Sequence, residues 1–263
     1  MPILQKPESS QDVIAKYGLT ALRSGADLAV SESGDLALNK EGYPRIGSVA
    51  HDAMHRLTES WRWNAPALRT MFVAGLELRE DYARFNAERE AVMSQPLIPG
   101  EFSHLSQIAG FHAAFDGMAS SAVSQSAIAG AIIVVLASIL QRFKNALGDC
   151  EDDWKIGNPK FNGVSLGDLI AAAANSFRHA DEWVEANHAG EFNDRQARSI
   201  NVLRQAWVIG INSFVFDAAP ICMVVLERIA SGDFENLARS VLGFANELTL
   251  KAKERERSEC SPR

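Results

Sequence analysis

The sequence predicts an all-α fold, a helical bundle with a small N-terminal arm or hairpin. Apolar residues recur at helical spacing over long stretches, as in the series Phe234, Leu237, Val241, Leu242, Ala245 and Leu248. Helix-start signals precede several such stretches, whereas the alternating strands and helices of an α/β protein are missing. Apolar residues make up 47% of the 263 residues and charged residues 22%, which is typical of a folded globular protein.

Helices joined by short breaks are predicted for the first half of the chain, after an arm that contains a hairpin. The predicted helices run over 11–25, 48–63, 64–93, 102–115 and 118–147. Residues 26–38 read ADLAV, the turn-like SESGD and LAL, an alternation that indicates a small hairpin. Asn64 is a favourable N-cap, and Pro66 falls in the first turn of the helix that it would start. The last two of these helices are either a pair or one long helix that breaks near Gly117.

The second half is predicted to hold further helices and one long loop. The predicted helices run over 165–187, from 194 to the 217–220 region, over 221–230, and from 234 to about 250. Ser165 with Asp168 has the pattern of a helix start, and Asp194 is expected to cap the next helix. Residues 148–164 form the longest irregular stretch. The predicted organisation is an N-terminal arm at 1–47, a helical domain at 48–250 and a charged tail at 251–263.

Charge, cysteine usage and missing motifs exclude several classes of function. A net charge of −7 argues against a surface that neutralises a nucleic-acid backbone, so DNA is not expected as a partner, whereas a local basic pocket for RNA stays open. Cys150, Cys222 and Cys260 form no Cys-x-x-Cys pair, and the N-terminus lacks the apolar segment of a signal peptide, so we expect a cytoplasmic protein. No phosphate-binding glycine pattern and no Gly-x-Ser-x-Gly elbow occur, and we expect no cofactor.

One histidine pattern has the spacing of a metal site. His51, His55 and Glu59 are four residues apart and would share one face of a helix, as the two histidines of zinc-binding helices do. A complete site needs ligands from elsewhere in the chain. The stripe is polar and is followed by Arg62, which favours a solvated face. We therefore expect no bound metal.

One uncharged stretch raises the question of a membrane helix. No charged residue occurs from Met118 to Gln141, and Arg142 and Lys144 follow closely. Several serines and Gln125 interrupt its first half, which leaves about 14 strongly apolar residues, a length that suits a buried helix better than a membrane span. A membrane is therefore not the expected partner. A membrane-inserted effector acting through 118–141 is the alternative.

The segment 166–183 is the most informative about function. Its apolar residues form one helical stripe, made of Leu166, Leu169, Ile170, Ala173, Phe177, Ala180 and Val184. Asn175, Arg178, His179 and Glu182 fall on the opposite face, and Trp183 lands on the same polar side. Either this is an ordinary amphipathic helix with an exposed Arg178–Glu182 pair, or these polar groups and the indole line a groove or a subunit interface.

The same segment carries a resemblance to a known family. Residues 131–145, AIIVVLASILQRFKN, resemble the long apolar helix of HEPN-domain (higher eukaryotes and prokaryotes nucleotide-binding) proteins, and AANSFRH resembles the family's signature. Asn175 and His179 match the Asn and His of that signature, whereas Ala174 stands where the signature has its Arg. In the ribonuclease members the Arg and His act on the RNA phosphodiester at a dimer interface. The resemblance covers about residues 100–190, and Arg178 is the nearest cation that could replace the missing one.

These observations predict a helical binding or assembly module that resembles HEPN proteins and has degenerate catalysis. Its binding residues would be Asn175, Glu182 and Trp183 with Arg178 and His179, and its partner a second copy, another protein or RNA. By the family resemblance its setting would be a bacterial RNA-targeting, toxin–antitoxin or phage-defence system. The alternative is a metal-independent endoribonuclease with His179 as acid or base and Arg178 as the cation.

Overall fold

The computed structural model describes residues 6–95, 102–148, 150–209 and 221–259, and it confirms the all-α fold. The elements in these ranges are α1 (Ser10–Tyr17), the 3-10 helix η1 (Thr20–Leu22), α2 (Val49–Met93), α3 (Phe102–Leu147), α4 (Glu151–Ile156), β1 (Lys160–Phe161), β2 (Val164–Ser165), α5 (Leu166–Arg178), α6 (Ala180–Ala189), α7 (Asp194–Gln205), α8 (Ile221–Ala230) and α9 (Phe234–Glu259). The strands β1 and β2 form one small antiparallel pair.

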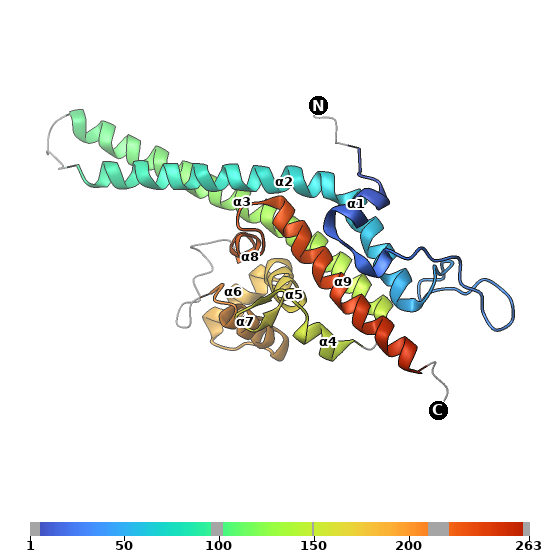
Figure 1. The fold of residues 1–263 in the computed structure, drawn as a ribbon. Coiled ribbons are helices and arrows are strands. Elements are labelled where there is room, and N and C mark those ends of the chain that lie inside the picture. The colour runs from blue at the N-terminus through green and yellow to red at the C-terminus, as the bar shows by residue number, and fades with distance from the viewer. Residues whose placement is uncertain (1–5, 96–101, 149, 210–220, 260–263) are drawn as a thin grey trace.

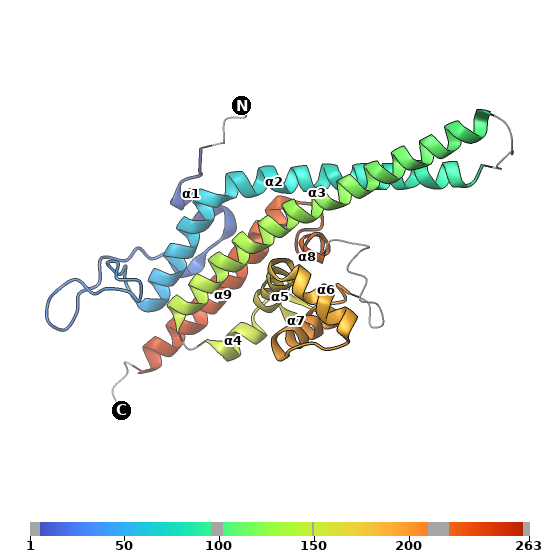
Figure 2. The same ribbon diagram turned by 180° about the vertical axis from the view of Figure 1, so that it is seen from behind.

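Two long antiparallel helices, α2 and α3, form the frame of the molecule (Figure 1). α9 packs along their base, while α5 and α8 pack on α3 and α7 packs on α5. Both ribbon views show the connected ends of α2 and α3 projecting far beyond the other helices (Figure 2). The core lies at the base of this hairpin, where Trp61 stacks on Phe234 and Trp154 meets Phe244 edge-on.

α2 is one continuous helix, so the prediction that Asn64 starts a new helix is wrong. The Asn64 side chain donates from Nδ2 to the Ser60 carbonyl oxygen at 2.7 Å, a bond within the helix. Pro66 lies in the interior, where it lacks an N–H and removes one backbone hydrogen bond. A proline inside a helix usually produces a bend, and α2 changes direction between its base and its projecting part (Figure 1).

α3 is likewise unbroken at Gly117. There the ring of Phe85, from α2, lies so close that a β-carbon on Gly117 would come within 2.8 Å of it. The glycine therefore allows α2 and α3 to approach each other in the projecting part of the hairpin, and it does not end the helix. Of the two alternatives predicted for 102–147, neither the pair nor the broken helix forms.

In the second half of the chain, the helices begin closer to the predicted positions than they end. The Ser165 hydroxyl accepts from the Asp168 backbone N–H at 3.2 Å, which confirms the predicted cap of α5. The predicted loop at 148–164 contains α4 and the pair β1–β2, and Asn193, not Asp194, caps α7. The helix predicted to reach the 217–220 region ends at Gln205, and 210–220 lie outside the described residues.

The N-terminal arm contributes to the core through α1 and η1, with Val13, Leu19 and Leu22 buried. Between η1 and α2 the predicted hairpin at 26–38 is present as antiparallel bridges, Val30 with Leu36 among them. At the other end of the chain, α9 continues through Glu259 and includes most of the charged residues that follow 250. Helical residues thus replace much of the tail predicted at 251–263.

Candidate functional site

A break at His179 separates α5 from α6 and changes the geometry predicted for 166–183. His179 has φ −122° and ψ 32°, so it leaves the helical conformation, and α6 starts at the next residue. The helical phase that placed Trp183 on the polar side therefore stops at this point. Trp183 is fully buried in the core, and its predicted place on the polar face is wrong.

Asn175 and Trp183 are packing residues in the structure. Asn175 is 9% exposed and donates from Nδ2 to the Ser199 hydroxyl at 3.0 Å, which ties α5 to α7. Trp183 fills the core beneath α6. The alanines that precede Asn175 are also buried, as expected where neighbouring helices approach closely. These two predicted binding residues therefore hold α5, α6 and α7 together.

Arg178, His179 and Glu182 stay at the surface, where two of them interact. His179 Nδ1 and Glu182 Oε1 lie 3.0 Å apart, and the imidazole keeps about a third of its surface exposed. Arg178 donates to the Ser138 hydroxyl of α3 at 3.4 Å, so the predicted Arg178–Glu182 pair does not form. An imidazole oriented by a carboxylate is the arrangement in which histidine serves as a general base or acid.

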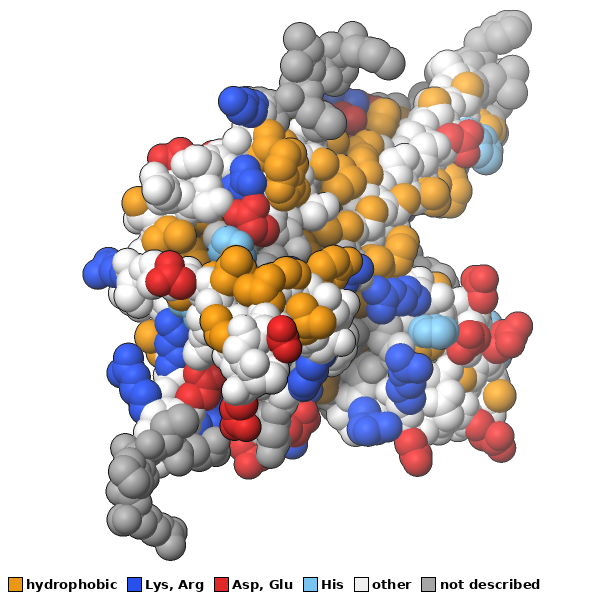
Figure 3. All heavy atoms as spheres, turned by 90° about the vertical axis from the view of Figure 1, so that its right-hand side faces the viewer, with side chains coloured by type: hydrophobic (Ala, Val, Ile, Leu, Met, Phe, Trp, Pro, Cys, Tyr) orange, Lys and Arg blue, Asp and Glu red, His pale blue; other side chains and the backbone are white. Residues whose placement is uncertain are grey.

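Two further cations lie on the neighbouring helix α7 and were not predicted from the sequence. Arg195 and Arg198 are exposed on α7, which packs against α5. Figure 3 shows Lys and Arg side chains gathered near a histidine on the lobe below the projecting hairpin. Their spacing of three residues places both on one face of a helix and is visible in the sequence. That this helix lies beside α5 follows from tertiary contacts such as the Asn175–Ser199 hydrogen bond.

The stripe of His51, His55 and Glu59 is not a solvated face, in contrast to the sequence-based interpretation. His51 is 6% exposed, and its Nδ1 lies 3.3 Å from Nζ of Lys253 in α9. Glu59 pairs with Arg62 and accepts from the Ser10 hydroxyl of α1. Within the described residues no group of His, Cys, Asp and Glu side chains is arranged to hold a metal ion.

The free part of the α2–α3 hairpin is a second candidate surface. No residue of α2 beyond Gly75 is buried, and between 106 and 128 of α3 only Ala114, Ser121 and Gln125 are buried. Phe115 is 44% and Val123 72% exposed. Among the described helices, α3 alone is long and apolar enough to cross a membrane by length and composition. The buried helix predicted for 118–141 is present only in the C-terminal half of that range, where most of the buried residues lie.

The free hairpin presents two different faces. In Figure 3 hydrophobic and other uncharged side chains cover most of the hairpin at the upper right, with acidic and histidine side chains among them. Between 106 and 141 of α3, Asp116 is the only Asp, Glu, Lys or Arg, whereas α2 carries eight of these residues between 76 and 93. The chain matches no known protein family, no curated protein and no solved structure.

Proposed function

We propose that the protein is a helical assembly module whose free α2–α3 hairpin pairs with the hairpin of a second copy. The observation that carries this proposal is the outer face of α3, which has Asp116 as its single Asp, Glu, Lys or Arg and which the rest of the described chain leaves uncovered. Large apolar side chains that are exposed on this part of α3, such as Phe115 and Val123, are stabilised when a partner buries them. The contacts within the hairpin indicate which side a partner would cover.

Several charged residues of α2 form ion pairs within the molecule. Arg84 pairs with Asp81 at 2.7 Å, and Arg79 pairs with Glu227 of α8. These pairs satisfy the outer side of α2 without a partner. Among the residues described between 106 and 128, α3 makes no ion pair, and the exposed Ala109, Ala113 and Ala127 would allow another helix to approach closely. The partner therefore contacts α3.

A second copy fits this face because Asp116 is the only Asp, Glu, Lys or Arg of α3 between 106 and 141, so the face offers little charge for a charged partner to complement. In a two-fold dimer the same surface patch of each copy takes part in the contact, so a strip with so few charges is complementary to itself. Two helical hairpins that meet along such strips form a four-helix bundle. Apolar side chains gather toward the free end, where Met93 and Ile108 are exposed at a small hollow and Phe115 is exposed farther along α3. The free halves of two hairpins thus provide the contact.

The expected dimer is of moderate affinity. A helical strip of roughly 25 residues is about 38 Å long and about 10 Å wide, so two copies bury on the order of 800 Å² from α3 alone. Stable interfaces bury about 1,200 Å² or more, so the flanks of α2 must contribute. We therefore expect the dimer to dissociate on dilution to low micromolar concentrations.

A lipid bilayer is a poorer match for the same face. α2 packs against α3 in the projecting part, as the close approach of Phe85 to Gly117 shows. Insertion of the hairpin would carry the charged residues of α2, such as Arg84 and Asp81, into hydrocarbon. A protein surface covers α3 and leaves these pairs in water.

Sedimentation of the full chain over a range of concentrations tests this proposal. We expect a monomer–dimer equilibrium that Val123→Glu weakens at least tenfold, because it places a charge on both copies at the contact. Val30→Glu is the matched control, since Val30 is 61% exposed but lies in the arm. The proposal is contradicted if the chain stays monomeric at about 100 μM. It is also contradicted if the chain binds lipid vesicles and Val123→Glu abolishes that binding.

The His179–Glu182 pair favours a second candidate, the metal-independent endoribonuclease. Its support is an imidazole held by a carboxylate at 3.0 Å, with Arg178, Arg195 and Arg198 exposed on the same and the adjacent helix. These groups could hold an RNA phosphate and move a proton. The HEPN resemblance of 131–145 and 173–179 points to the same chemistry, and a role in RNA targeting, toxin–antitoxin function or phage defence is part of this candidate.

A further inference from the structure

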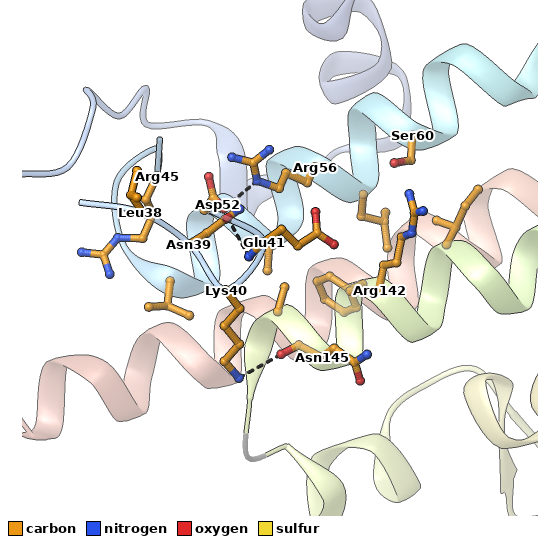
Figure 4. A pocket seen from close by; sticks show the side chains of 16 residues that line it. Leu38, Asn39, Lys40, Glu41, Arg45, Asp52, Arg56, Ser60, Arg142 and Asn145 are labelled. Carbon is orange, nitrogen blue, oxygen red and sulfur yellow. Dashed lines mark hydrogen bonds and ion pairs between the residues drawn. The ribbon is translucent and has the colours of Figure 1, made fainter. Parts of the chain in front are cut away.

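A pocket lies at the base of the α2–α3 pair, remote from the free end of the hairpin. It has a volume of about 260 Å³ and is bounded by the first turns of α2, the last turns of α3 and the loop at 38–45 (Figure 4). Its described lining includes no residue of 175–183 and none of the projecting hairpin. Ligand binding here is therefore independent of the two functions proposed above.

The floor of the pocket is apolar. Ala53 and Leu57 of α2 face Ile139 and Phe143 of α3, and all four side chains are buried. Ala53 and Ala146 are too short to fill the space between the two helices, which leaves the pocket. A floor of this kind binds the apolar part of a ligand, and specificity then depends on the few polar groups at the rim.

One ion pair at the rim holds the loop in place. The Asp52 carboxylate accepts from Arg56 Nε at 2.8 Å, from the Ile46 backbone N–H at 2.9 Å and from Asn39 Nδ2 at 3.1 Å. Burial raises the pKa of Asp52, but these donors outweigh it and hold the pKa below its usual value. Asp52 and Arg56 thus satisfy each other and fix the loop that carries Glu41.

Two other charged groups at the rim have no such partner. Among the described residues neither the Arg142 guanidinium nor the Glu41 carboxylate makes a hydrogen bond or ion pair. Figure 4 shows their side chains reaching into the same space from opposite sides, Glu41 from the loop and Arg142 from α3. A nearby guanidinium nitrogen, Nε of Arg45, is buried without a hydrogen-bond partner. The pocket therefore offers a cation and a carboxylate above an apolar floor.

We propose that this pocket binds a small zwitterionic amphiphile of the kind represented by an α-amino acid with a large apolar side chain. Its carboxylate pairs with Arg142, its ammonium group faces Glu41, and its side chain lies on Leu57, Ile139 and Phe143. A ligand with a carboxylate but no amine leaves Glu41 without a partner and is repelled by it. A ligand with an amine but no carboxylate leaves Arg142 without a partner and is repelled by that guanidinium. The pair of free charges thus selects for a ligand with both.

Three probes that differ only in their charged groups test the proposal by calorimetry on the full chain: L-phenylalanine, 3-phenylpropionate and 2-phenylethylamine. L-Phenylalanine should bind about tenfold more tightly than either analogue. Arg142→Gln should weaken its binding about tenfold and leave 2-phenylethylamine unaffected, whereas Glu41→Gln should weaken L-phenylalanine and strengthen 3-phenylpropionate. Arg198→Gln, an exposed arginine on α7, is the matched control.

Three outcomes would overturn the proposed binding of a zwitterionic ligand. Absence of L-phenylalanine binding at about 10 mM, tighter binding of either analogue, or unchanged binding to Arg142→Gln overturns the assignment. Arg142 and Glu41 are exposed, so their substitution should leave the far-ultraviolet circular dichroism unchanged. A variant that retains this spectrum and loses only L-phenylalanine and 3-phenylpropionate binding locates the carboxylate on Arg142.

Discussion

The ring of Phe177 in α5 lies directly against the backbone of Gly130 in α3, where a β-carbon would overlap the ring. This contact joins α5 to the middle of α3. Phe177 is 37% exposed, so its ring lies at the edge of the core and covers α3 from outside. A side chain at position 130 would push α5 away from α3.

We therefore predict that Gly130→Ala destabilises the protein. Overlap with the Phe177 ring should cost about 1–3 kcal/mol, partly offset by the better helix propensity of alanine. Gly110→Ala on the same helix is the control, because its β-carbon would lie 3.7 Å from Val92 in ordinary contact, and we expect it to be neutral or stabilising. Urea unfolding of both variants measures the difference. Equal stabilities of the two would contradict the role of the Phe177 contact.

A second prediction concerns Trp183, which the structure assigns to the core. Trp183→Ala should cost about 3–5 kcal/mol, because it removes a fully buried indole. Trp63→Ala should change the free energy of unfolding by less than about 1 kcal/mol, because Trp63 is 63% exposed and its ring stacks with Arg62 of the same helix. Thermal unfolding of the two variants compares the losses, and similar losses would place Trp183 outside the core.

Local signals account for what the sequence predicted correctly. The Ser165 cap and the bridge between Val30 and Leu36 depend on residues a few positions apart, so their patterns are visible without tertiary information. The apolar spacing from Phe234 onward likewise predicted α9. Predictions failed where a local signal competed with packing. Pro66 has the features of a helix start but lies inside α2.

The candidate sites were less predictable, because they depend on which helices meet. A helical wheel placed Trp183 with His179, but the break at His179 turned the indole into the core. The unpaired charges of the pocket, Glu41 and Arg142, are about a hundred residues apart and are brought together only by the pairing of α2 with α3. No spacing rule within one helix relates such positions.

A third prediction concerns pH. Burial lowers the pKa of His51, and the positive charges of Lys253 and His55 lower it further, against the opposing effect of Asp52. The unfolded chain therefore takes up a proton below about pH 6.5 that the folded protein does not, and stability falls as the pH falls through this region. The loss from this residue ends when the pH reaches the pKa of His51 in the folded protein, because both states then carry the proton.

The His51→Gln variant isolates this effect, since glutamine can still accept from Lys253 but does not titrate. We expect its urea midpoint to change less than that of the wild type between about pH 7.5 and about pH 5.5. His188→Gln, at an exposed position of α6, is the control and should keep the wild-type dependence. Identical slopes for His51→Gln and the wild type would mean that His51 gains its proton equally in both states.

The last prediction tests the endoribonuclease. If His179 moves the proton, His179→Ala should abolish metal-independent cleavage of single-stranded RNA, and Glu182→Gln should reduce it about tenfold or more, because the imidazole loses the carboxylate at 3.0 Å. His188→Ala removes an exposed histidine from the same helix region and should retain full activity. Cleavage is followed with a labelled RNA in the presence of a chelator. Cleavage that survives in His179→Ala, or its absence in the wild type across a panel of RNAs, rules out this candidate. The assembly proposal would then be judged by sedimentation alone, because the exposed face of α3 does not include His179.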